Sequence, residues 1–410
     1  MAQRAWLAMA AKEAARRVLS GAGDPPVRII LPGGGTVEPR GAAPRFTLRI
    51  RTWRALAGML LDPESGFAEG YAAGAIEVDG PLAEFCDEIY RRCPQPRTAR
   101  GFAGLLSRYL DWTQSRSLRG ARDNIHRHYD LGNEFYRLWL DEEMLYTCAF
   151  FPREDATLEE AQEAKMERVA RKLALQPGER VAEAGCGWGA FALYIARVHG
   201  CRVRAFNISE EQIAWARRRA REEGLEDRVE FILDDYRNIT GAYDVFVSIG
   251  MLEHVGKDHY GELGEVIRRT IGDRGRGLLH FIGRTRPAPL SPWIRRRIFP
   301  GAYAPALSEA LPLLEAGGYR VADVENLRSH YARTLRCWRE RFEAAEPQVR
   351  RMFGEEFARA WKLYLAGSEA AFRSGSLQLY QVLFAGPACT RALWTREGEQ
   401  QAQLRTAGGV

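Results

Sequence analysis

Short apolar runs alternate with amphipathic segments through the second half of the chain. Seven runs have the length and the β-branched or aromatic content of strands, and they cover residues 181–184, 202–206, 229–233, 245–249, 278–282, 320–324 and 379–384. Segments long enough for a helical crossover separate the early runs. Because strands that alternate with helices favour parallel pairing, the pattern predicts an α/β fold with a doubly wound, mostly parallel sheet of seven strands.

The first 95 residues follow another pattern, and we expect them to form a small N-terminal α+β domain. Helical sequence opens this region, and strand-like alternation follows at residues 45–51 and 75–78. Two prolines within residues 93–97 mark its end, because proline terminates helices. Beyond them the sequence predicts a helical, arginine-rich connector at residues 96–122, a second domain with the large sheet at residues 123–390, and a polar tail at residues 391–410.

Capping signals mark two helices next to the first strands of the large sheet. Thr157 with Glu160, and Ser209 with Gln212, have the spacing of a capping box, in which each side chain bonds the other residue's backbone N–H. Gly224 is expected to end the second of these helices in the left-handed conformation.

The composition is that of a globular protein of two or three domains. The chain has 410 residues, 46% of them hydrophobic and 27% charged, and no apolar run reaches the ~18 residues that span a bilayer. Basic residues outnumber acidic ones by 59 to 53, a surplus that fits nucleic acid and an anionic membrane surface equally well. Seven scattered cysteines lack zinc-site spacing, so we predict no metal centre and a reducing, cytoplasmic compartment.

A glycine-rich loop follows the first strand of the large sheet. Gly185, Gly187 and Gly189 have G-x-G-x-G spacing at the start of a helix, where backbone N–H groups can face a ligand. Dinucleotide-binding folds instead use G-x-G-x-x-G and an acid at the tip of the second strand. Here the second strand ends at Asn207, and the acid, Glu183, precedes the glycines. The pattern resembles class I S-adenosylmethionine methyltransferases, which implies that Glu183 lies near the amino group of the cofactor.

Further motifs narrow the resemblance to one family. They are HYDLGN at residues 128–133, LYTCAFF at 145–151, NISEEQ at 207–212, DYR at 235–237, GMLEHVG at 250–256, LHFIG at 279–283 and IFPG at 298–301. Together they resemble the cyclopropane fatty acid synthase family, which includes the mycolic acid cyclopropane synthases. The N-terminal region is similar to that of the bacterial phospholipid enzymes of this family, which implies a lipid-associated domain.

The resemblance implies transfer of the methyl group of S-adenosylmethionine to a cis double bond of an unsaturated phospholipid acyl chain. The carbocation that results is deprotonated by a bound bicarbonate ion and closes to a cyclopropane. Because an alkene is a weak nucleophile, such a site must align it with the methyl group, exclude water and supply a base. Aromatic rings can stabilise the cation, and Tyr129, Tyr146, Phe150 and Phe281 are candidates.

The same resemblance assigns the catalytic residues. The family's bicarbonate site corresponds to Cys148, Glu253, His280, the backbone of Ile282 and Tyr331, and a nearby helix corresponds to the segment around Ser368. Glu253 is expected to accept a proton or orient the anion, and His280 and Tyr331 to donate hydrogen bonds to it. The strand pattern independently puts Glu253 and His280 at the carboxyl ends of the fourth and fifth strands, where doubly wound sheets bind ligands. Taken singly, each residue could equally be an ordinary buried side chain.

The cofactor site carried over from the family comprises Tyr146, Thr147, Glu183, Gly185, Gly187, Gly189, Asn207, Gln212, Tyr236 and Ile249. Gln212 also has an interpretation as the second half of a capping box. Glu183 and Asn207 stand where the family more often has Asp and Thr. Ser368, followed by Glu369, stands where the family usually has cysteine and a small residue, which leaves the exact product open.

One basic segment suggests contact with a membrane surface. Arg295, Arg296 and Arg297 have Trp293 and residues 298–299 beside them, a combination of cations for phosphate and apolar groups for the upper acyl layer. A solvated arginine surface explains the same residues. With the family resemblance, we expect a cytoplasmic protein peripherally associated with anionic phospholipid at the inner face of the membrane. The oligomeric state, a homodimer included, stays open.

Three alternatives are considered. A nucleic-acid methyltransferase is disfavoured, and no nucleic-acid partner is expected. The fourth strand ends in GMLEH and lacks the Asn/Asp-Pro-Pro-aromatic motif that amino-methylating enzymes use on flipped bases. A small-molecule N-methyltransferase could share the scaffold, but it would not need the anion site. Finally, loss of a different proton from the methylated acyl chain would give a methylene or methyl branch in place of the ring.

Overall fold

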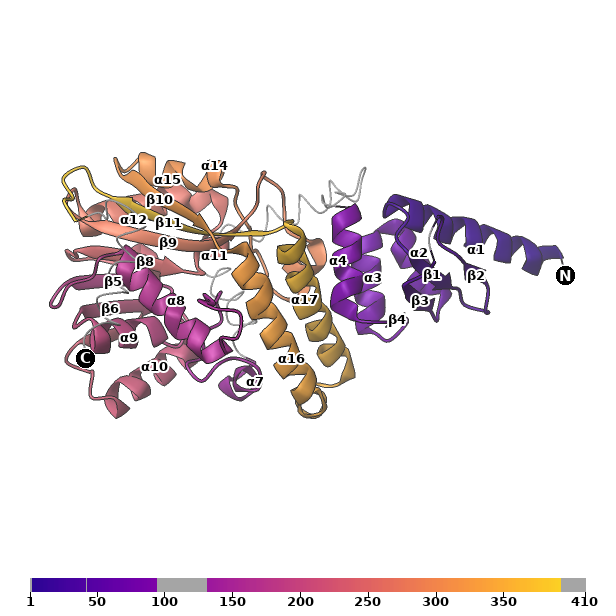
Figure 1. Ribbon diagram of the computed structural model, residues 1–410, viewed down its shortest axis with the longest axis horizontal. Coiled ribbons are helices and arrows are strands. Elements are labelled where there is room, and N and C mark those ends of the chain that lie inside the picture. Colours follow the sequence, from indigo (N-terminus) through magenta and orange to yellow (C-terminus); the bar gives the residue numbers. More distant parts are fainter. Residues whose placement is uncertain (1, 42, 94–130, 392–410) are drawn as a thin grey trace. The chain divides into compact units, whose positions relative to one another are not determined.

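The computed structural model describes residues 2–41, 43–93 and 131–391 (Figure 1). These residues form two compact units. The smaller comprises the described parts of residues 1–116, 290–300 and 331–377, and the larger those of 117–289, 301–330 and 378–410. The predicted domain end at residues 94–97, the connector at 96–122, residues 128–130 of the HYDLGN motif with Tyr129, and residues 392–410 of the tail lie outside the described residues.

The larger unit contains a seven-stranded sheet in the order β10-β11-β9-β8-β5-β6-β7. Its strands are β5 Arg180–Ala184, β6 Arg202–Asn207, β7 Val229–Leu233, β8 Val245–Ile249, β9 Arg276–Gly283, β10 Arg320–Asn326 and β11 Gln378–Ala385. The strands β5 to β9 are parallel, and β11 is antiparallel to both of its neighbours. Each strand overlaps one of the seven predicted runs, so the predicted fold class is confirmed.

Helices cover both faces of this sheet (Figure 1). One face packs under α8 Leu158–Lys172, α9 Ala190–Val198 and α10 Glu210–Glu222, and the other under α11 Leu252–Val255, α12 Tyr260–Ile271, α14 Leu307–Ala310 and α15 Pro312–Glu315. Short elements complete the unit, namely α7 Asn133–Arg137, η1 Tyr236–Asn238 and η2 Lys257–His259. Alternation along the strands sends Val247 to the first layer and Phe246 to the second.

The predicted helix signals are confirmed with one exception. Thr157 and Glu160 form both hydrogen bonds of a capping box at the start of α8. Gly224 adopts a φ of +65° directly after the end of α10. Ser209 caps α10 by accepting from the backbone N–H of Gln212, but Gln212 does not complete the box, because its side chain binds Asn207 instead.

The smaller unit contains a four-stranded sheet in the order β2-β1-β3-β4. Its elements are α1 Ala2–Gly21, β1 Val27–Ile30, β2 Thr36–Val37, β3 Phe46–Ile50, α2 Trp53–Leu61, α3 Pro63–Ala72, β4 Ile76–Asp79, α4 Leu82–Arg92, α13 Pro292–Arg297, α17 Glu355–Ser374 and, from residue 331 onward, α16 Arg328–Phe353. The strands β3 and β4 match the predicted ones. The pattern missed β1 and β2, because four and two residues offer too little alternation.

A buried ionic cluster joins the helices of the smaller unit. Glu369 of α17 is 1% exposed, and its carboxylate binds Arg339 at 2.8 Å and Arg336 at 3.4 Å, both from α16. Arg373, one turn after Glu369, lies 3.2 Å from the carboxylate of Asp87 in α4. Glu369, one of the residues that depart from the family pattern, therefore has a structural role within this unit.

Candidate active site

The glycine loop between β5 and α9 contains three left-handed glycines. Gly185, Gly187 and Gly189 have φ values of +80°, +53° and +86°. A Cβ at Gly189 would lie 2.6 Å from the ring of Phe231, and one at Gly185 would lie 2.9 Å from the Cβ of Met251. A Cβ at Gly187 would meet nothing within 4 Å. Packing thus requires the outer two glycines, whereas Gly187 keeps the backbone open to an approaching ligand.

A buried acid and a buried lysine lie behind the loop. Glu183 of β5 is buried, and its Oε2 has no hydrogen-bond partner within the described residues. Burial raises the pKa of Glu183 to about 8, against the opposing effect of the charge on Lys165. Lys165 of α8 is 0% exposed, and its Nζ donates to Oγ1 of Thr147 at 3.0 Å. Burial lowers the pKa of Lys165 to about 8, although the charges of Asp141, Cys148 and Glu183 favour its protonated form.

Polar side chains at the end of β6 hold the loop from the other side. Nδ2 of Asn207 donates to the carbonyl oxygen of Gly187 at 3.2 Å and to Oε1 of Gln212 at 2.7 Å. Two other predicted cofactor residues lie at the ends of strands that run parallel to β5. Tyr236 in η1 follows β7, and Ile249 is the last residue of β8. All of these positions therefore lie at the carboxyl edge of the parallel strands, where the fold binds ligands.

The segment between α7 and α8 is anchored from α8. Nε2 of Gln162 donates to the carbonyl oxygen of Thr147 at 2.9 Å. Cys148 is completely buried. Tyr146 packs against Trp139, with ring centroids 5.1 Å apart. A Cβ at Gly250 would lie 3.0 Å from Cγ2 of Thr147, so this segment lies against the end of β8.

Glu253 is held by the backbone of the neighbouring strand. It lies in α11, directly after β8, and its Oε1 accepts a hydrogen bond from the N–H of Ile282 in β9 at 2.5 Å. Its Oε2 is buried and has no partner within the described residues. Burial raises the pKa of Glu253 to about 7, and the bond from Ile282 opposes the shift. Near neutral pH this carboxyl group can therefore either donate or accept a proton.

His280 of β9 is buried next to the same strand end. Its carbonyl oxygen accepts from the N–H of Gly250 at 2.8 Å. Its Nδ1 lies 3.1 Å from Nε2 of Gln381 in β11, and its own Nε2 has no partner within the described residues. Burial, followed by the charges of Lys165 and Lys172, lowers its pKa well below the ordinary value, so the ring is neutral at pH 7.

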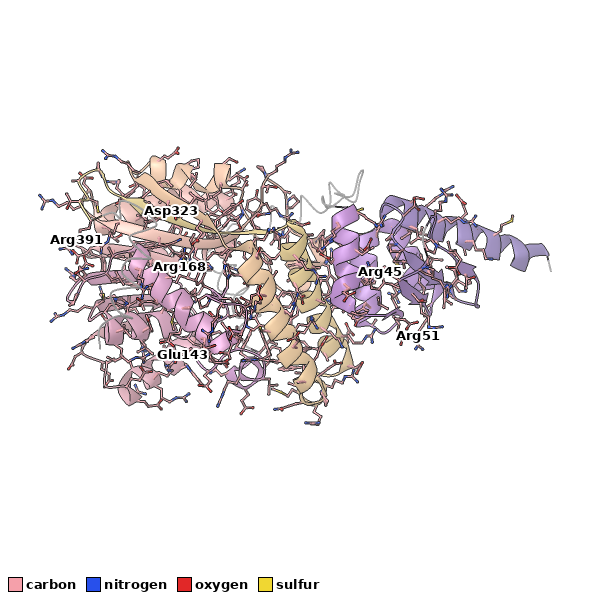
Figure 2. The ribbon with its side chains drawn as sticks, in the orientation of Figure 1. Arg45, Arg51, Glu143, Arg168, Asp323 and Arg391 are labelled. Atoms are coloured by element: carbon pink, nitrogen blue, oxygen red, sulfur yellow. The ribbon has the colours of Figure 1, made fainter. Side chains whose placement is uncertain are left out.

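These polar residues form a row across one face of the sheet. The strand register pairs Ile249 with His280, His280 with Gln381, and Gln381 with Glu325 of β10. Glu183 lies on the same face one step away, because it pairs with Val247 of β8. The helix α8 covers this face. Arg168, which Figure 2 labels near Asp323 of β10, binds Glu325 through two bonds of 2.9 and 2.6 Å.

Four further predicted residues lie outside this row. Tyr331 and Ser368 belong to the smaller unit, where the Tyr331 ring packs on Phe372 with centroids 4.5 Å apart. Phe281 projects to the opposite face of the sheet from His280 and packs on Tyr380, so its predicted role near the cation is wrong. The ring of Phe150 lies between the Arg168 guanidinium, 4.5 Å from its centroid, and the His330 ring, with centroids 4.6 Å apart. These contacts give Phe150 a role in packing.

Two buried polar residues of this region were missed at the sequence level. Lys165 follows Ala161 and precedes Val169 at four-residue spacing, so a charged residue on the apolar stripe of α8 was the available signal. Gln381 interrupts an apolar run in a strand that is buried along its whole length. In both cases the signal was a polar residue where the periodic pattern demands an apolar one.

The basic segment predicted to meet the membrane differs from expectation. Trp293 and Ile298, which belong to the smaller unit, are buried, and the ring of Phe299 packs edge-on against that of Tyr364 with centroids 5.5 Å apart. Arg297 forms ion pairs with Glu69 at 2.7 Å and Glu356 at 2.9 Å. Trp293 and Ile298 are thus used for packing and are not available to enter an acyl layer, whereas contact of the arginines with a membrane stays a prediction.

The seven-stranded sheet, with a left-handed glycine loop after its first parallel strand, is the architecture of a class I S-adenosylmethionine-dependent methyltransferase. The family model described as mycolic acid cyclopropane synthetase matches residues 116–382. A probable fatty acid methyltransferase of Pseudomonas putida is 33% identical over 91% of this chain and 95% of that protein. The cyclopropane-fatty-acyl-phospholipid synthase of Escherichia coli K12 is 39% identical over 63% of this chain and 66% of that protein.

Solved structures agree with these relatives. The crystal structure of a mycolic acid cyclopropane synthase, CmaA1, complexed with SAH and CTAB is 31% identical to this chain. It superimposes with a TM-score of 0.61 over 64% of this chain and 97% of that one. The chain belongs to the mycolic acid cyclopropane synthetase family, and it is an S-adenosylmethionine-dependent C-methyltransferase.

Proposed function

We propose that this enzyme methylates a cis double bond in an unsaturated phospholipid acyl chain and produces a cyclopropane ring with the help of bound bicarbonate. In the balanced reaction the acyl chain gains one CH₂, and S-adenosylhomocysteine and one proton are released. Bicarbonate would supply a weak base for that proton. The printed names of the two relatives, a fatty acid methyltransferase and a fatty-acyl-phospholipid synthase, support an acyl substrate.

One observation carries the proposal of an anion site. Oε2 of Glu253 and Nε2 of His280 are both buried and both without a partner in the described residues. Glu253 lies in α11, which follows β8, and His280 lies in β9, the parallel neighbour of β8. Buried polar atoms are normally paired, so two orphans at one strand edge indicate a missing polar ligand. A neutral Glu253 carboxyl and a neutral His280 can each donate one hydrogen bond to an anion, whereas an amine would find no fixed charge there.

The other proposed anion residues contribute in different ways. The Cys148 thiol is buried and donates to the carbonyl oxygen of Ala149 at 3.1 Å, so it would act as a weak donor to the anion only by turning away from that oxygen. The N–H of Ile282 already binds Glu253, so Ile282 would act on the anion through that carboxyl group. Tyr331 as a further donor, and Ser368 as a neighbour, stay proposals from the family resemblance.

The cofactor proposal rests on the edge formed by the loop. Gly185, Gly187 and Gly189 would accommodate the cofactor's methionine part, and Glu183 would receive its amino group. Cofactor contacts are proposed also for Tyr146, Thr147, Asn207, Gln212, Tyr236 and Ile249. The orphaned Oε2 of Glu183 fits a cationic ligand group, because a buried carboxylate is stabilised only by a partner.

For peripheral contact with an anionic membrane, the smaller unit offers a different surface from the one predicted. On α2, Trp53 is 53%, Leu60 44% and Leu61 83% exposed. These residues fall on one side of the helix together with the exposed Ala57. Arg54 beside them is exposed and forms no ion pair with the described residues. None of the described helices combines the length and the apolar character that crossing a bilayer requires.

The test of the proposed function uses the full chain, radiolabelled S-adenosylmethionine and vesicles of cis-unsaturated phosphatidylglycerol. We expect label in the acyl chains, a mass gain of one CH₂ and a ring pattern in fragmentation spectra, with a rate that falls in bicarbonate-depleted buffer. A methylene or methyl branch would select the alternative fate of the cation. If the protein binds S-adenosylhomocysteine in calorimetry yet leaves the acyl chains unlabelled, the lipid proposal is wrong.

A further inference from the structure

Gln381 is a fully buried glutamine for which the mechanism above has no use. It lies in β11, directly opposite His280 in the antiparallel pair with β9. Its Nε2 is 3.1 Å from Nδ1 of His280, and its Oε1 has no partner within the described residues. Burying an amide whose oxygen is unpaired costs free energy. The presence of a glutamine at this position, bonded to the histidine, therefore requires an explanation.

The other polar group opposite Gln381 is already paired with cations, so His280 is the partner for the Gln381 amide. In the register, Gln381 also faces Glu325, but the Glu325 carboxylate is occupied by Arg168 at 2.6 and 2.9 Å and by Lys172 at 2.7 Å. The amide N–H of Gln381 is therefore not drawn toward that acid. The charged groups that act on the His280 ring are Lys165, Lys172 and Glu325.

The direction of this hydrogen bond decides which ring nitrogen carries the proton. In a neutral imidazole one nitrogen donates and the other accepts. If the amide N–H of Gln381 donates to Nδ1, Nδ1 has no proton, and the single proton is on Nε2. That Nε2 is the buried, unpartnered atom beside the end of β8. The opposite tautomer would direct a lone pair at any anion bound there, and repulsion would follow.

We propose that Gln381 is a positioning residue that donates its amide N–H to Nδ1 of His280 and thereby keeps the imidazole proton on Nε2, directed at the anion site. The inference rests on the proposed function only for the identity of the acceptor at Nε2. The tautomer itself is a property of the protein without ligands. The same arrangement fixes the ring's orientation, because the bond joins two opposed strand positions.

The direct test reads the tautomer by nuclear magnetic resonance. The full chain is labelled with ¹⁵N at its seven histidines, and His280→Gln identifies the signals of His280 by their loss. We expect a protonated Nε2 and an unprotonated Nδ1 in the ligand-free protein, unchanged from pH 6 to pH 9. Added bicarbonate should shift the Nε2 signal. An Nδ1-protonated ring in the wild-type protein would overturn the inference without the need for any variant.

Two variants test the role of Gln381 itself. Gln381→Met keeps the volume but removes the donor, and we expect a mixture of tautomers and a kcat about 10-fold lower, with an unchanged affinity for S-adenosylhomocysteine. Gln381→Glu offers only an acceptor when ionised, so it should move the proton to Nδ1 or charge the ring. The control is Gln378→Met in the same strand, whose side chain accepts from Asn326 at 2.8 Å; it should cost stability but not kcat.

The outcomes separate this inference from the proposed function. If Gln381→Met keeps the proton fully on Nε2 and its kcat stays within twofold of the wild type, Gln381 does not set the tautomer and the inference is wrong. If the expected tautomer is found and responds to Gln381→Met but not to bicarbonate, the positioning role is supported and the proposed anion is not.

Discussion

The Oε1 atom of Glu253 accepts a hydrogen bond from the backbone N–H of Ile282 at 2.5 Å, and this bond fixes a buried carboxyl group of α11 to the strand β9. One oxygen satisfies the strand edge while the other stays unpaired. The group thus keeps its orientation whether it is protonated or ionised, but burial penalises the ionised form.

The first prediction concerns the stability of the ligand-free protein. Burial raises the pKa of Glu253 from 4.5 to about 7, so this group's contribution is fully present below pH 4.5 and is lost as the pH rises through about 7. Glu253→Gln removes the titration and keeps the acceptor for Ile282. We expect the variant to gain stability over the wild type, by about 1 kcal/mol more at pH 8 than at pH 6. Thermal melts across this range measure the difference, with the exposed Glu265→Gln as control.

The same residue allows a prediction for activity. Because the neutral carboxyl group is the form that can donate to an anion, the apparent KM for bicarbonate should rise as the pH increases through about 7. Glu253→Ala should lose activity by about 100-fold, and Glu253→Gln by less, since its amide still donates. The KM of Glu253→Gln should not vary with pH. An equal pH dependence in the wild type and in Glu253→Gln would contradict this role.

The glycine loop offers a prediction that separates binding from folding. Gly189→Ala would force a Cβ to 2.6 Å from Phe231, and we expect a loss of about 3 kcal/mol in unfolding free energy. Gly187→Ala meets nothing within 4 Å, so only left-handed strain of about 1 kcal/mol applies. Gly187→Ala should nevertheless bind S-adenosylhomocysteine more weakly, by about 10-fold or more, because the new methyl group occupies the open side of the loop. Calorimetry measures the affinity, and denaturant melts measure the unfolding free energy. Tight binding of S-adenosylhomocysteine by Gly187→Ala would contradict the assignment of this loop to the cofactor site.

Much of this fold could be predicted from the sequence, because each strand of the large sheet is a run of apolar residues bounded by turns. Residues Glu253 and His280 could be placed at neighbouring strand ends for the same reason, since parallel strands share an edge. The roles of Gly185 and Gly189 could not be separated from that of Gly187, because their contacts with Met251 and Phe231 come from distant segments.

Other features depend on tertiary contacts that have no local signal. Trp293 and Ile298 have the residue types of an interfacial segment, yet both side chains are buried. Phe281 shows a different failure. Its neighbour His280 was assigned to the site, and the alternation of the strand sends Phe281 to the opposite face. The pairing of Gln381 with His280 needed the register of β9 against β11, which joins residues about a hundred positions apart.

The buried lysine leads to a prediction about the cofactor. Lys165 supplies a positive charge next to Glu183 and a hydrogen bond to Thr147. We expect Lys165→Met to weaken S-adenosylhomocysteine binding about 10-fold, since Thr147 loses its anchor and ionised Glu183 loses a counter charge. Lys172→Met removes another buried lysine of α8, one that binds Glu325, and should leave the affinity unchanged. Calorimetric titration of the three proteins decides. Equal affinities for the wild type and Lys165→Met would exclude this role.

A prediction for the smaller unit concerns the exposed side of α2. Leu61 is 83% and Trp53 53% exposed, and Arg54 stands beside them without an ion pair in the described residues. We expect the full chain to sediment with vesicles of anionic phospholipid, more weakly at high salt. Trp53→Gln with Leu61→Gln should reduce the bound fraction several-fold at an unchanged cofactor affinity. The matched control is Val198→Gln, an exposed apolar residue of the larger unit. An equal loss in the control would argue against α2 as the contact.

The last prediction concerns Glu369, the residue that follows Ser368. Its carboxylate is 1% exposed and binds Arg339 and Arg336 of α16, while the exposed Glu356 on the same helix binds Arg297. Removal of the buried carboxylate takes away the acceptor that Arg336 and Arg339 share, although Arg339 keeps its pair with Glu343 at 3.1 Å. An exposed pair is instead screened by water. We therefore expect Glu369→Gln to lower the unfolding free energy by about 3 kcal/mol and Glu356→Gln by less than about 0.5 kcal/mol. Ser368→Cys, which restores the family's usual residue, should leave the unfolding free energy unchanged. Denaturant melts of the full chain test all three, and a Glu369→Gln protein as stable as Glu356→Gln would show that the cluster does not hold α16 and α17 together.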